Sequence, residues 1–239
     1  EDKETAAVTL VLRDEPAATY AHAEELADAI RVLRARGKKV ICSWEQAGPK
    51  ALYVCASADR TVINPAGGLQ YNGLHTTHFY LAKLAQNLGI KADFVRIADH
   101  KLAPEMFTNE GPSDVARADH EDYLRNVEAV FVRNLELYRK LDPEKVRAAT
   151  RKGPFSPAEA RDAGFVDGYA FDDELERVTQ DVVGRKVAYE KFEPETKAAE
   201  SFGPRSKLGV LYVDGNMVDG RSSKIPLLDM KLVGGDTIA

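Results

Sequence analysis

Residues 40–63, VICSWEQAGPKALYVCASADRTVI, contain one complete strand–helix–strand pattern. The β-branched runs at residues 40–42 and 61–63 predict two short buried strands. Gly48 and Pro49 between them predict the start of a helix, because proline is favoured in the first helical turn. A strand, a helix and a second strand in this order are typical of a parallel β-α-β unit, so the stretch predicts an α/β fold.

The same alternation continues on both sides of this unit. Residues 8–12 predict a strand, and residues 23–33 predict a helix that ends at Gly37, a natural C-terminal cap. Downstream, residues 79–88 predict a helix and residues 93–97 predict a further strand. We therefore expect an α/β fold around a largely parallel sheet in the N-terminal half of the chain.

The pattern becomes helical in the second half. Apolar side chains recur at helical spacing from residue 115 to residue 138 and predict one long amphipathic helix that begins after Ser113. Ser156 and Glu159 are spaced as a capping box, which predicts the start of another helix. Further helices are predicted at residues 143–149, 157–163 and 172–183, and a strand at residues 187–192.

A change in composition divides the chain near its C-terminal end. Residues 193–206 are polar and hold few branched side chains, which is typical of a linker. We therefore expect a first domain over residues 1–192 and a second, incomplete domain over residues 207–239. Residues 208–213, LGVLYV, predict the first strand of that second domain.

Composition excludes several classes of function. The chain has 239 residues, 44% hydrophobic and 30% charged, which describes an ordinary globular protein. Its net charge of -5 argues against a nucleic-acid-binding surface. No apolar run approaches the roughly 20 residues of a membrane helix, and the opening Glu-Asp-Lys-Glu is not a signal peptide. Neither a Gly-x-Gly-x-x-Gly fingerprint nor a Walker A loop is present, and we expect no cofactor.

Three features with possible chemistry also have simple structural explanations. Cys42 and Cys55 do not form a Cys-x-x-Cys pair, and we interpret both as small buried apolar residues. His75 and His78 lie three apart on a predicted helix, but no third ligand accompanies them, so we expect no metal site. The glycines at 67–68 either close the strand at 61–63 in a turn or bring backbone N–H groups to an oxyanion.

Lys101 is the strongest candidate for a catalytic residue. It follows the β-branched run at residues 94–97 and precedes Pro104, which marks the start of a new element. A lysine at the mouth of a buried strand loses hydration, which lowers its pKa and provides a neutral amine as a base. A base needs a nucleophile, yet none of the eight serines lies in a Gly-x-Ser-x-Gly elbow.

The lysine segment is similar to a known family. Residues 96–107, RIADHKLAPEMF, resemble the segment that carries the catalytic lysine in the SppA (protease IV) family of signal peptide peptidases, whose common form is Arg-x-Gly-x-Tyr-Lys-Ser-Ala-x-Glu-Pro-Phe. The Arg, Lys, Ala, Glu and Phe stay in register, whereas Leu102 replaces the serine. Residues 156–167 resemble the family's Ala-x-x-x-Gly-Leu-Val-Asp segment, and residues 208–239 resemble the opening of the second repeat in its two-repeat form.

This resemblance implies a fold and a division of labour. The fold is crotonase-like (ClpP/crotonase), with stacked β-β-α units and a long C-terminal amphipathic helix. Lys101 would be the general base of a Ser/Lys serine endopeptidase whose serine lies on the second repeat, outside this chain, so the chain alone would be inactive. Residues 15–18 and Lys50 stand where the catalytic repeat has its oxyanion glycines and its nucleophile.

The resemblance also implies substrates, partners and a location. Cleaved signal peptides and other extended apolar peptides would be the substrates, in a homo-oligomer associated with the membrane of a bacterial cell envelope through a segment outside this chain. Two alternatives remain open. The missing nucleophile favours a non-catalytic assembly or substrate-docking module, and the fold is shared with acyl-CoA enzymes, in which the lysine segment would have no role.

Overall fold

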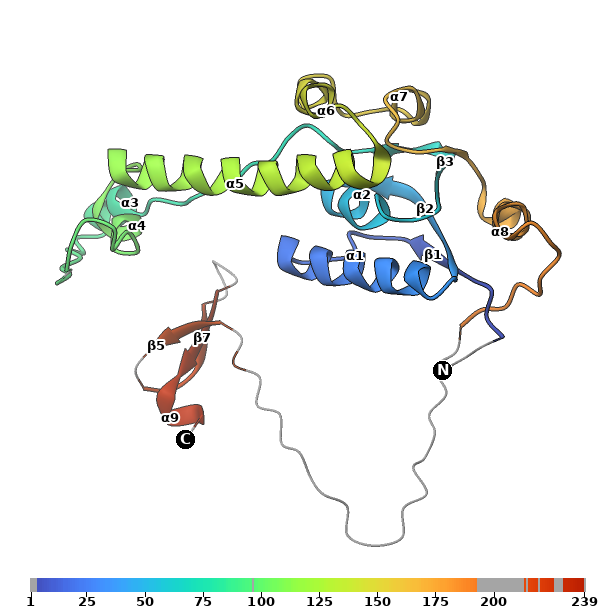
Figure 1. Cartoon of the computed structure of the whole chain (residues 1–239). Coiled ribbons are helices and arrows are strands. Elements are labelled where there is room, and N and C mark those ends of the chain that lie inside the picture. The colour runs from blue at the N-terminus through green and yellow to red at the C-terminus, as the bar shows by residue number, and fades with distance from the viewer. Residues whose placement is uncertain are drawn as a thin grey trace, which may run out of the picture. The chain divides into compact units, whose positions relative to one another are not determined.

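Four parallel strands form the sheet of the N-terminal unit, Glu1–Glu190 (Figure 1). They are β1 (Ala7–Leu12), β2 (Lys39–Ala47), β3 (Arg60–Leu69) and β4 (Gly168–Tyr169), and they lie side by side in that order. The structure is a computed structural model. Its sheet confirms the predicted α/β class, including the strand–helix–strand unit at residues 40–63.

The structure describes residues 4–95, 97–192, 213, 215–218, 220–225 and 230–238. These belong to two compact units, Glu1–Glu190 and Lys191–Ala239. The linker predicted at residues 193–206, and all but the last residue of the strand predicted at 208–213, lie outside the described residues.

Helices connect the strands and cover the sheet. Helix α1 (Tyr20–Ala35) joins β1 to β2, and α2 (Pro49–Cys55) joins β2 to β3. Side chains buried from these elements form the core with the end of the long helix α5 (Asp114–Arg139). Among the largest fully buried side chains are Ile30, Trp44, Leu52, Ile63, Leu69, Phe131, Leu135 and Phe165. Each contributes about 1.5–3 kcal/mol by leaving water, before the cost of ordering the chain.

Helix α5 has a buried end and an exposed end. Phe131, Val132, Asn134 and Leu135 are buried, but from residue 117 to residue 130 no side chain of the helix is buried. The exposed part extends away from the sheet and carries α3 (Ala82–Asn87) and α4 (Glu105–Thr108) at its N-terminal end (Figure 1). We call residues 78–112, which contain these two short helices, the head.

Arg139 fastens the other end of α5 to the sheet. Its guanidinium donates to the carbonyl of Gly164 at 2.9 Å and to both carboxylate oxygens of Asp167. Asp167 also accepts a hydrogen bond from the backbone N–H of Thr61 in β3 at 2.7 Å. Only 9% of the Arg139 side chain is exposed, so this charge network is shielded from solvent and fixes the position of the helix.

The helices after α5 follow the sequence predictions. These are α6 (Pro143–Ala149), α7 (Pro157–Asp162), the 3-10 helix η1 (Asp172–Glu174) and α8 (Leu175–Val183). The capping box at Ser156 and Glu159 is present, and its hydrogen bonds lower the pKa of the Glu159 carboxyl. The strand predicted at residues 187–192 is wrong: Tyr189 and Phe192 are exposed, and no described strand pairs with this segment.

Of the two interpretations of the glycines at 67–68, the turn that would close the strand is wrong, because β3 continues through them. A Cβ atom on Gly67 would lie 1.8 Å from the carbonyl oxygen of Glu45. The two strands therefore approach each other more closely than a side chain allows, beside a bulge between Trp44 and Gln46. Glycine at 67 serves this close approach rather than a chain reversal.

Cys42 and Cys55 form a disulfide that spacing alone did not predict. Both are fully buried, as expected, but they are not two separate apolar side chains. Strand β2 and helix α2 are consecutive and pack together, which brings the two Cα atoms to 5.8 Å, within the range that a disulfide spans.

The second unit has a small mixed sheet of its own. Strands β5 (Asn216–Val218), β7 (Met230–Gly234) and β6 (Ser223–Ile225) lie in that order, and α9 (Gly235–Ile238) follows β7 directly. The backbone N–H of Ser222 donates to Thr237 at 2.8 Å. In the described parts of both units, no helix combines the length and apolarity needed to cross a bilayer.

Candidate functional site

Lys101 lies in the loop that leads into α4, within the head. Its side chain is exposed, and the buried strand predicted before it does not form. Val95 and Ile97 are 102% and 84% exposed. A strand needs a neighbour for its backbone hydrogen bonds, and no described segment pairs with residues 93–95 or 97. The strand predicted before Lys101 is therefore wrong, and so is the desolvation that this strand would have given the lysine. The role of Lys101 as a base stays a prediction.

A tight turn holds the loop after Lys101. The backbone N–H of Glu105 donates to the carbonyl of Leu102 at 2.9 Å, and α4 begins there after Pro104, as the sequence predicted. The N–H of Leu81 donates to the carbonyl of Met106 at 2.6 Å, which ties α4 to the segment before α3. The backbone that follows Lys101 is thus ordered by local hydrogen bonds even though the lysine side chain is exposed.

Histidines connect the head to α5. His100 places Nδ1 3.1 Å from the carboxylate of Asp119, and the ring of His78 stacks on that of His120 with centroids 3.7 Å apart. Desolvation and the neighbouring His120 lower the pKa of His78. His75 and His78 lie outside any helix, contrary to prediction. Within the described residues, no group of three or more His, Cys, Asp or Glu side chains could hold a metal ion.

A hollow of about 260 Å³ adjoins the Lys101 loop. Leu102, Ala103, Glu105 and Met106 form one wall. The remaining walls come from the segment at 77–80 and from α5, and the full lining is Thr77, His78, Phe79, Tyr80, Leu102, Ala103, Glu105, Met106, Ala116 and His120. Half of these side chains are polar or charged, and Lys101 itself does not line the hollow.

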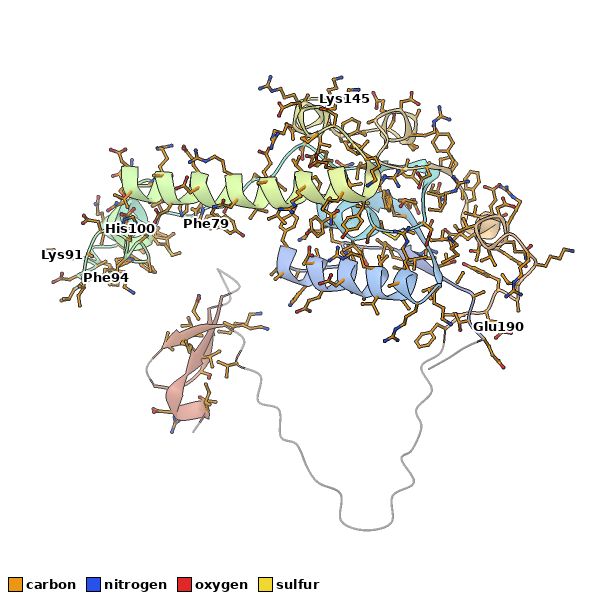
Figure 2. The ribbon with its side chains drawn as sticks, viewed as in Figure 1. Phe79, Lys91, Phe94, His100, Lys145 and Glu190 are labelled. Carbon is orange, nitrogen blue, oxygen red and sulfur yellow. A yellow bond between two sulfur atoms is a disulfide. The ribbon has the colours of Figure 1, made fainter. Side chains whose placement is uncertain are left out.

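Residues 15–18 and Lys50, which the resemblance places at the oxyanion glycines and the nucleophile of the catalytic repeat, lie at the carboxyl ends of β1 and β2. Lys50 donates through Nζ to the carbonyl of Ala18 at 3.1 Å, and the N–H of Gly48 donates to Glu15 Oε1 at 2.7 Å. The side chain of Glu15 therefore occupies the start of α2. Lys101 is not part of this group: Figure 2 shows His100, its neighbour in sequence, at the end of α5 that points away from the sheet.

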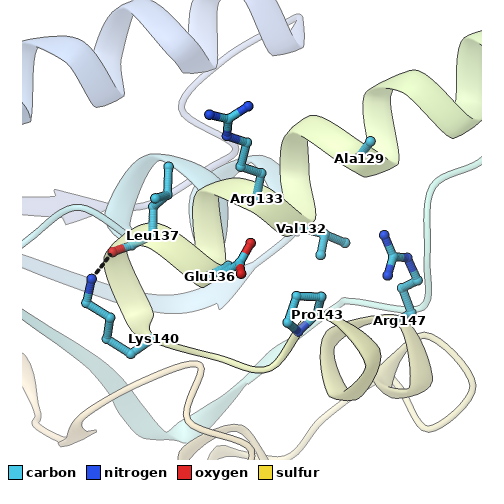
Figure 3. Close-up of a pocket in the computed structure, with 8 residues that line it drawn as sticks. All are labelled: Ala129, Val132, Arg133, Glu136, Leu137, Lys140, Pro143 and Arg147. Carbon is cyan, nitrogen blue, oxygen red and sulfur yellow. Dashed lines mark hydrogen bonds between the residues drawn. The ribbon is translucent and has the colours of Figure 1, made fainter.

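A larger hollow of about 570 Å³ lies between α5 and α6 (Figure 3). Charged side chains line much of it, and Lys140 bends back to donate to the carbonyl of Leu137 at 2.7 Å. The complete lining is Ala129, Val132, Arg133, Glu136, Leu137, Lys140, Pro143 and Arg147. Its lining holds no serine, cysteine, threonine or histidine, so it offers no hydroxyl or thiol nucleophile and no imidazole base.

Comparison with known proteins places the chain in a family. The model of peptidase family S49 matches residues 32–185, well over half of the sequence. The chain therefore belongs to peptidase family S49. This membership confirms the resemblance to SppA (protease IV) enzymes and favours a peptidase over an acyl-CoA enzyme.

Curated relatives bear the name of the predicted family. Protease 4 of Salmonella typhi is 21% identical over 255 residues, covering 100% of this chain and 40% of the relative. Protease 4 of Haemophilus influenzae is 25% identical over 227 residues, covering 88% of this chain and 36% of the relative. The chain thus spans about two-fifths of the length of these relatives.

Solved structures of a membrane-bound stomatin-specific protease, 1510-N, are also similar. A serine-to-alanine mutant has a TM-score of 0.40 at 9% identity, covering 73% of this chain and 84% of that one. A lysine-to-alanine mutant in complex with a substrate peptide has a TM-score of 0.36 at 10% identity, covering 73% and 80%.

Proposed function

We propose that this chain is the lysine-bearing part of a Ser/Lys serine peptidase and that Lys101 is its general base. The observation that carries the proposal is the segment at residues 96–107, which keeps the family's Arg, Lys, Ala, Glu and Phe in register in a chain that belongs to a peptidase family. The nucleophilic serine would lie in the part of the relatives' length that this chain does not span.

The chemistry needs Lys101 as a neutral amine. Its Nζ would take the proton from the serine Oγ as that oxygen attacks a peptide carbonyl, and the resulting lysinium would then protonate the departing amine. Water would hydrolyse the acyl-enzyme in the second half of the reaction, again with Lys101 as base. A free lysine has a pKa of about 10.4, so the assembled site must lower it towards working pH.

The exposed surface of the head suggests how the pKa of Lys101 would be lowered. Lys101 is accompanied by large apolar side chains that solvent reaches: Phe79, Leu84, Leu88, Ile90, Phe94, Val95, Ile97 and Phe107. Apolar residues gathered in this way are typical of an interaction site. We infer that the serine-bearing part covers the head, pairs with residues 93–97 as a strand, and excludes water from Lys101. Burial of that kind lowers a lysine pKa.

The finer points of function follow from the family resemblance. Substrates would be cleaved signal peptides and other extended apolar peptides, which suit a site built on an apolar surface. The enzyme would act as a homo-oligomer at the membrane of a bacterial cell envelope, held there by a segment outside this chain. The isolated chain would be inactive, because a base without its serine hydrolyses nothing efficiently.

Replacement of Lys101 tests the assignment. In the full-length protein, Lys101→Ala is expected to lower kcat by about 10³-fold, the usual contribution of a general base. A fluorogenic peptide gives the rate, and labelling by a serine-directed fluorophosphonate should fall with it. Lys91→Ala, an exposed lysine in the same head, is the matched control and should keep full activity. Full turnover by Lys101→Ala would remove Lys101 from the mechanism.

One alternative has support from the structure. An exposed apolar head is also what an assembly or substrate-docking module would present. In that case Lys101→Ala would leave fluorophosphonate labelling and kcat unchanged. Removing apolar side chains from the head, as in Ile97→Ser, would instead raise KM or change the oligomeric state.

A further inference from the structure

Glu105 is the only charged residue that is buried in the described parts of the chain. Its exposure is 4%, although most side chains around it in the head are open to solvent. A carboxylate loses several kcal/mol of hydration when it is buried, and it persists in such a place only when hydrogen bonds compensate the loss. The burial of Glu105 therefore requires specific partners.

Ser113 supplies two of those partners. Its hydroxyl lies 2.7 Å from Glu105 Oε1, and its backbone N–H donates to Glu105 Oε2 at 3.1 Å. Ser113 is the N-cap of α5 and accepts in turn from the N–H of Ala116 at 3.1 Å. The carboxylate thus lies at the N-terminal end of a 26-residue helix, where the helix dipole also favours a negative charge.

The backbone of Glu105 connects this anchor to Lys101. The N–H of Glu105 donates to the carbonyl of Leu102, the residue directly after Lys101, at 2.9 Å. The side chain of Glu105 therefore binds the start of α5, while its main chain closes the turn that begins at Leu102, directly after Lys101. Two hydrogen-bonded steps thus lead from the N-cap of α5 to the backbone of Leu102, the residue next to the candidate base.

We propose that Glu105 is the positioning residue for Lys101, holding the lysine loop at a fixed place on the N-terminus of α5. The proposal rests on the proposed function, in which Lys101 is the base. Misplacement of a catalytic group by about 1 Å can cost about 10²-fold in rate, so a base on an exposed loop needs such an anchor. Glu105 need not contact substrate to act in this way.

The test compares four variants of the full-length protein with a fluorogenic peptide. Glu105→Ala should lower kcat by about 10²-fold while KM stays within about twofold, because the base moves but the substrate site remains. Glu105→Gln, which keeps one acceptor oxygen, should recover part of that loss. Ser113→Ala should give a smaller loss. Glu110→Gln, an exposed glutamate five residues away, is the matched control and should behave as wild type.

Two further readouts separate positioning from a general loss of structure. The acid limb of the kcat–pH profile should move in Glu105→Ala, since a displaced lysine has a different environment. Hydrogen exchange should increase at residues 98–104 but not in the strands at residues 39–47 and 60–69. Should Glu105→Ala fold too poorly to assay, Glu105→Gln and Ser113→Ala carry the same comparison.

The outcomes also separate this proposal from the one on which it rests. If Lys101→Ala is inactive but Glu105→Ala keeps wild-type kcat and pH profile, positioning by Glu105 is wrong and the base assignment stands. If activity falls only in proportion to the folded fraction, with an unchanged pH profile, Glu105 is structural and the proposal is also overturned. If Lys101→Ala retains turnover, no base is left to position and both proposals fail.

Discussion

The two ends of α5 differ in almost every physical respect. At the C-terminal end, Phe131 and Leu135 are buried among aromatic and aliphatic side chains, and the Phe131 ring lies 5.2 Å from that of Tyr71. At the N-terminal end, the head keeps apolar side chains such as Phe79 and Phe94 in solvent (Figure 2). The side chain of Lys101, in the same head, is exposed as well. Buried contacts are concentrated at one end of α5 and exposed apolar side chains at the other, and this difference is why we propose a partner for the exposed end.

The largest expected effect comes from a matched pair of phenylalanines. Phe131→Ala should lower the free energy of unfolding by about 3–5 kcal/mol, because it leaves a cavity in the core. Phe79→Ala, in the head, should change it by less than about 0.5 kcal/mol, because Phe79 is 64% exposed. Denaturant unfolding of the two variants checks the contrast. Equal losses would show that the head shares the stability of the core.

The second-largest expected effect comes from the disulfide between Cys42 and Cys55, which should stabilise the core and not the head. Its sequence separation is 13 residues, and closing a loop of about that length stabilises a fold by about 3 kcal/mol. Reduction, or the double change Cys42→Ala with Cys55→Ala, should lower the unfolding free energy by that amount and leave hydrogen exchange in the head unchanged. Reductant should have no effect on the double variant. Two thiols that titrate in denatured, unreduced protein would disprove the bond.

The smallest expected effect is a pH-dependent loss of stability where His78 of the head stacks on His120 of α5. Because the folded state lowers the pKa of His78, its contribution to stability is present above the unfolded value of about 6.5 and is lost as pH falls through the folded pKa. Hydrogen exchange at residues 77–80 should rise between pH 7.5 and pH 5 relative to β2 and β3. Glu105, and the pair of His100 and Asp119, are the other titratable groups that face this contact.

His120→Ala isolates the contribution of the stacked pair. Without the neighbouring imidazole, the pKa of His78 should move back towards its ordinary value, because one of the two causes of its shift is removed. The pH dependence of exchange at residues 77–80 should then become weaker. An unchanged pH dependence of exchange would mean that the other titratable groups at this contact, and not the stacked histidines, cause it.

The fold could be predicted where its signals are local. Proline at residues 49 and 143 and the capping box at Ser156 decide helix starts within a few residues of themselves, so these predictions are confirmed. The strands predicted at residues 93–97 and 187–192 failed because a strand depends on a partner that its own sequence does not name. Gly67 was misread for the same reason, since its role depends on Glu45 in the neighbouring strand.

The candidate site was less predictable than the fold. Lys101 was selected through its resemblance to a family segment, and its exposure could not be read from the apolar residues around it. Glu105 stood in the same quoted segment, yet nothing in the sequence indicated that it is buried against Ser113, eight residues away. That contact exists because α4 folds back onto the start of α5. The sequence contains Glu105 and Ser113 but does not show that the two side chains are in contact.

Helix α5 is long enough for a small change at one end to move the other end appreciably. Its 26 residues extend about 39 Å at 1.5 Å per residue, from the Arg139 fastening to the Ser113 cap. A tilt of about 5° at the fastened end would carry the head through about 3 Å, as much as a hydrogen bond is long. In the proposed mechanism, the position of Lys101 would therefore depend partly on Arg139, Gly164 and Asp167, at the opposite end of the helix.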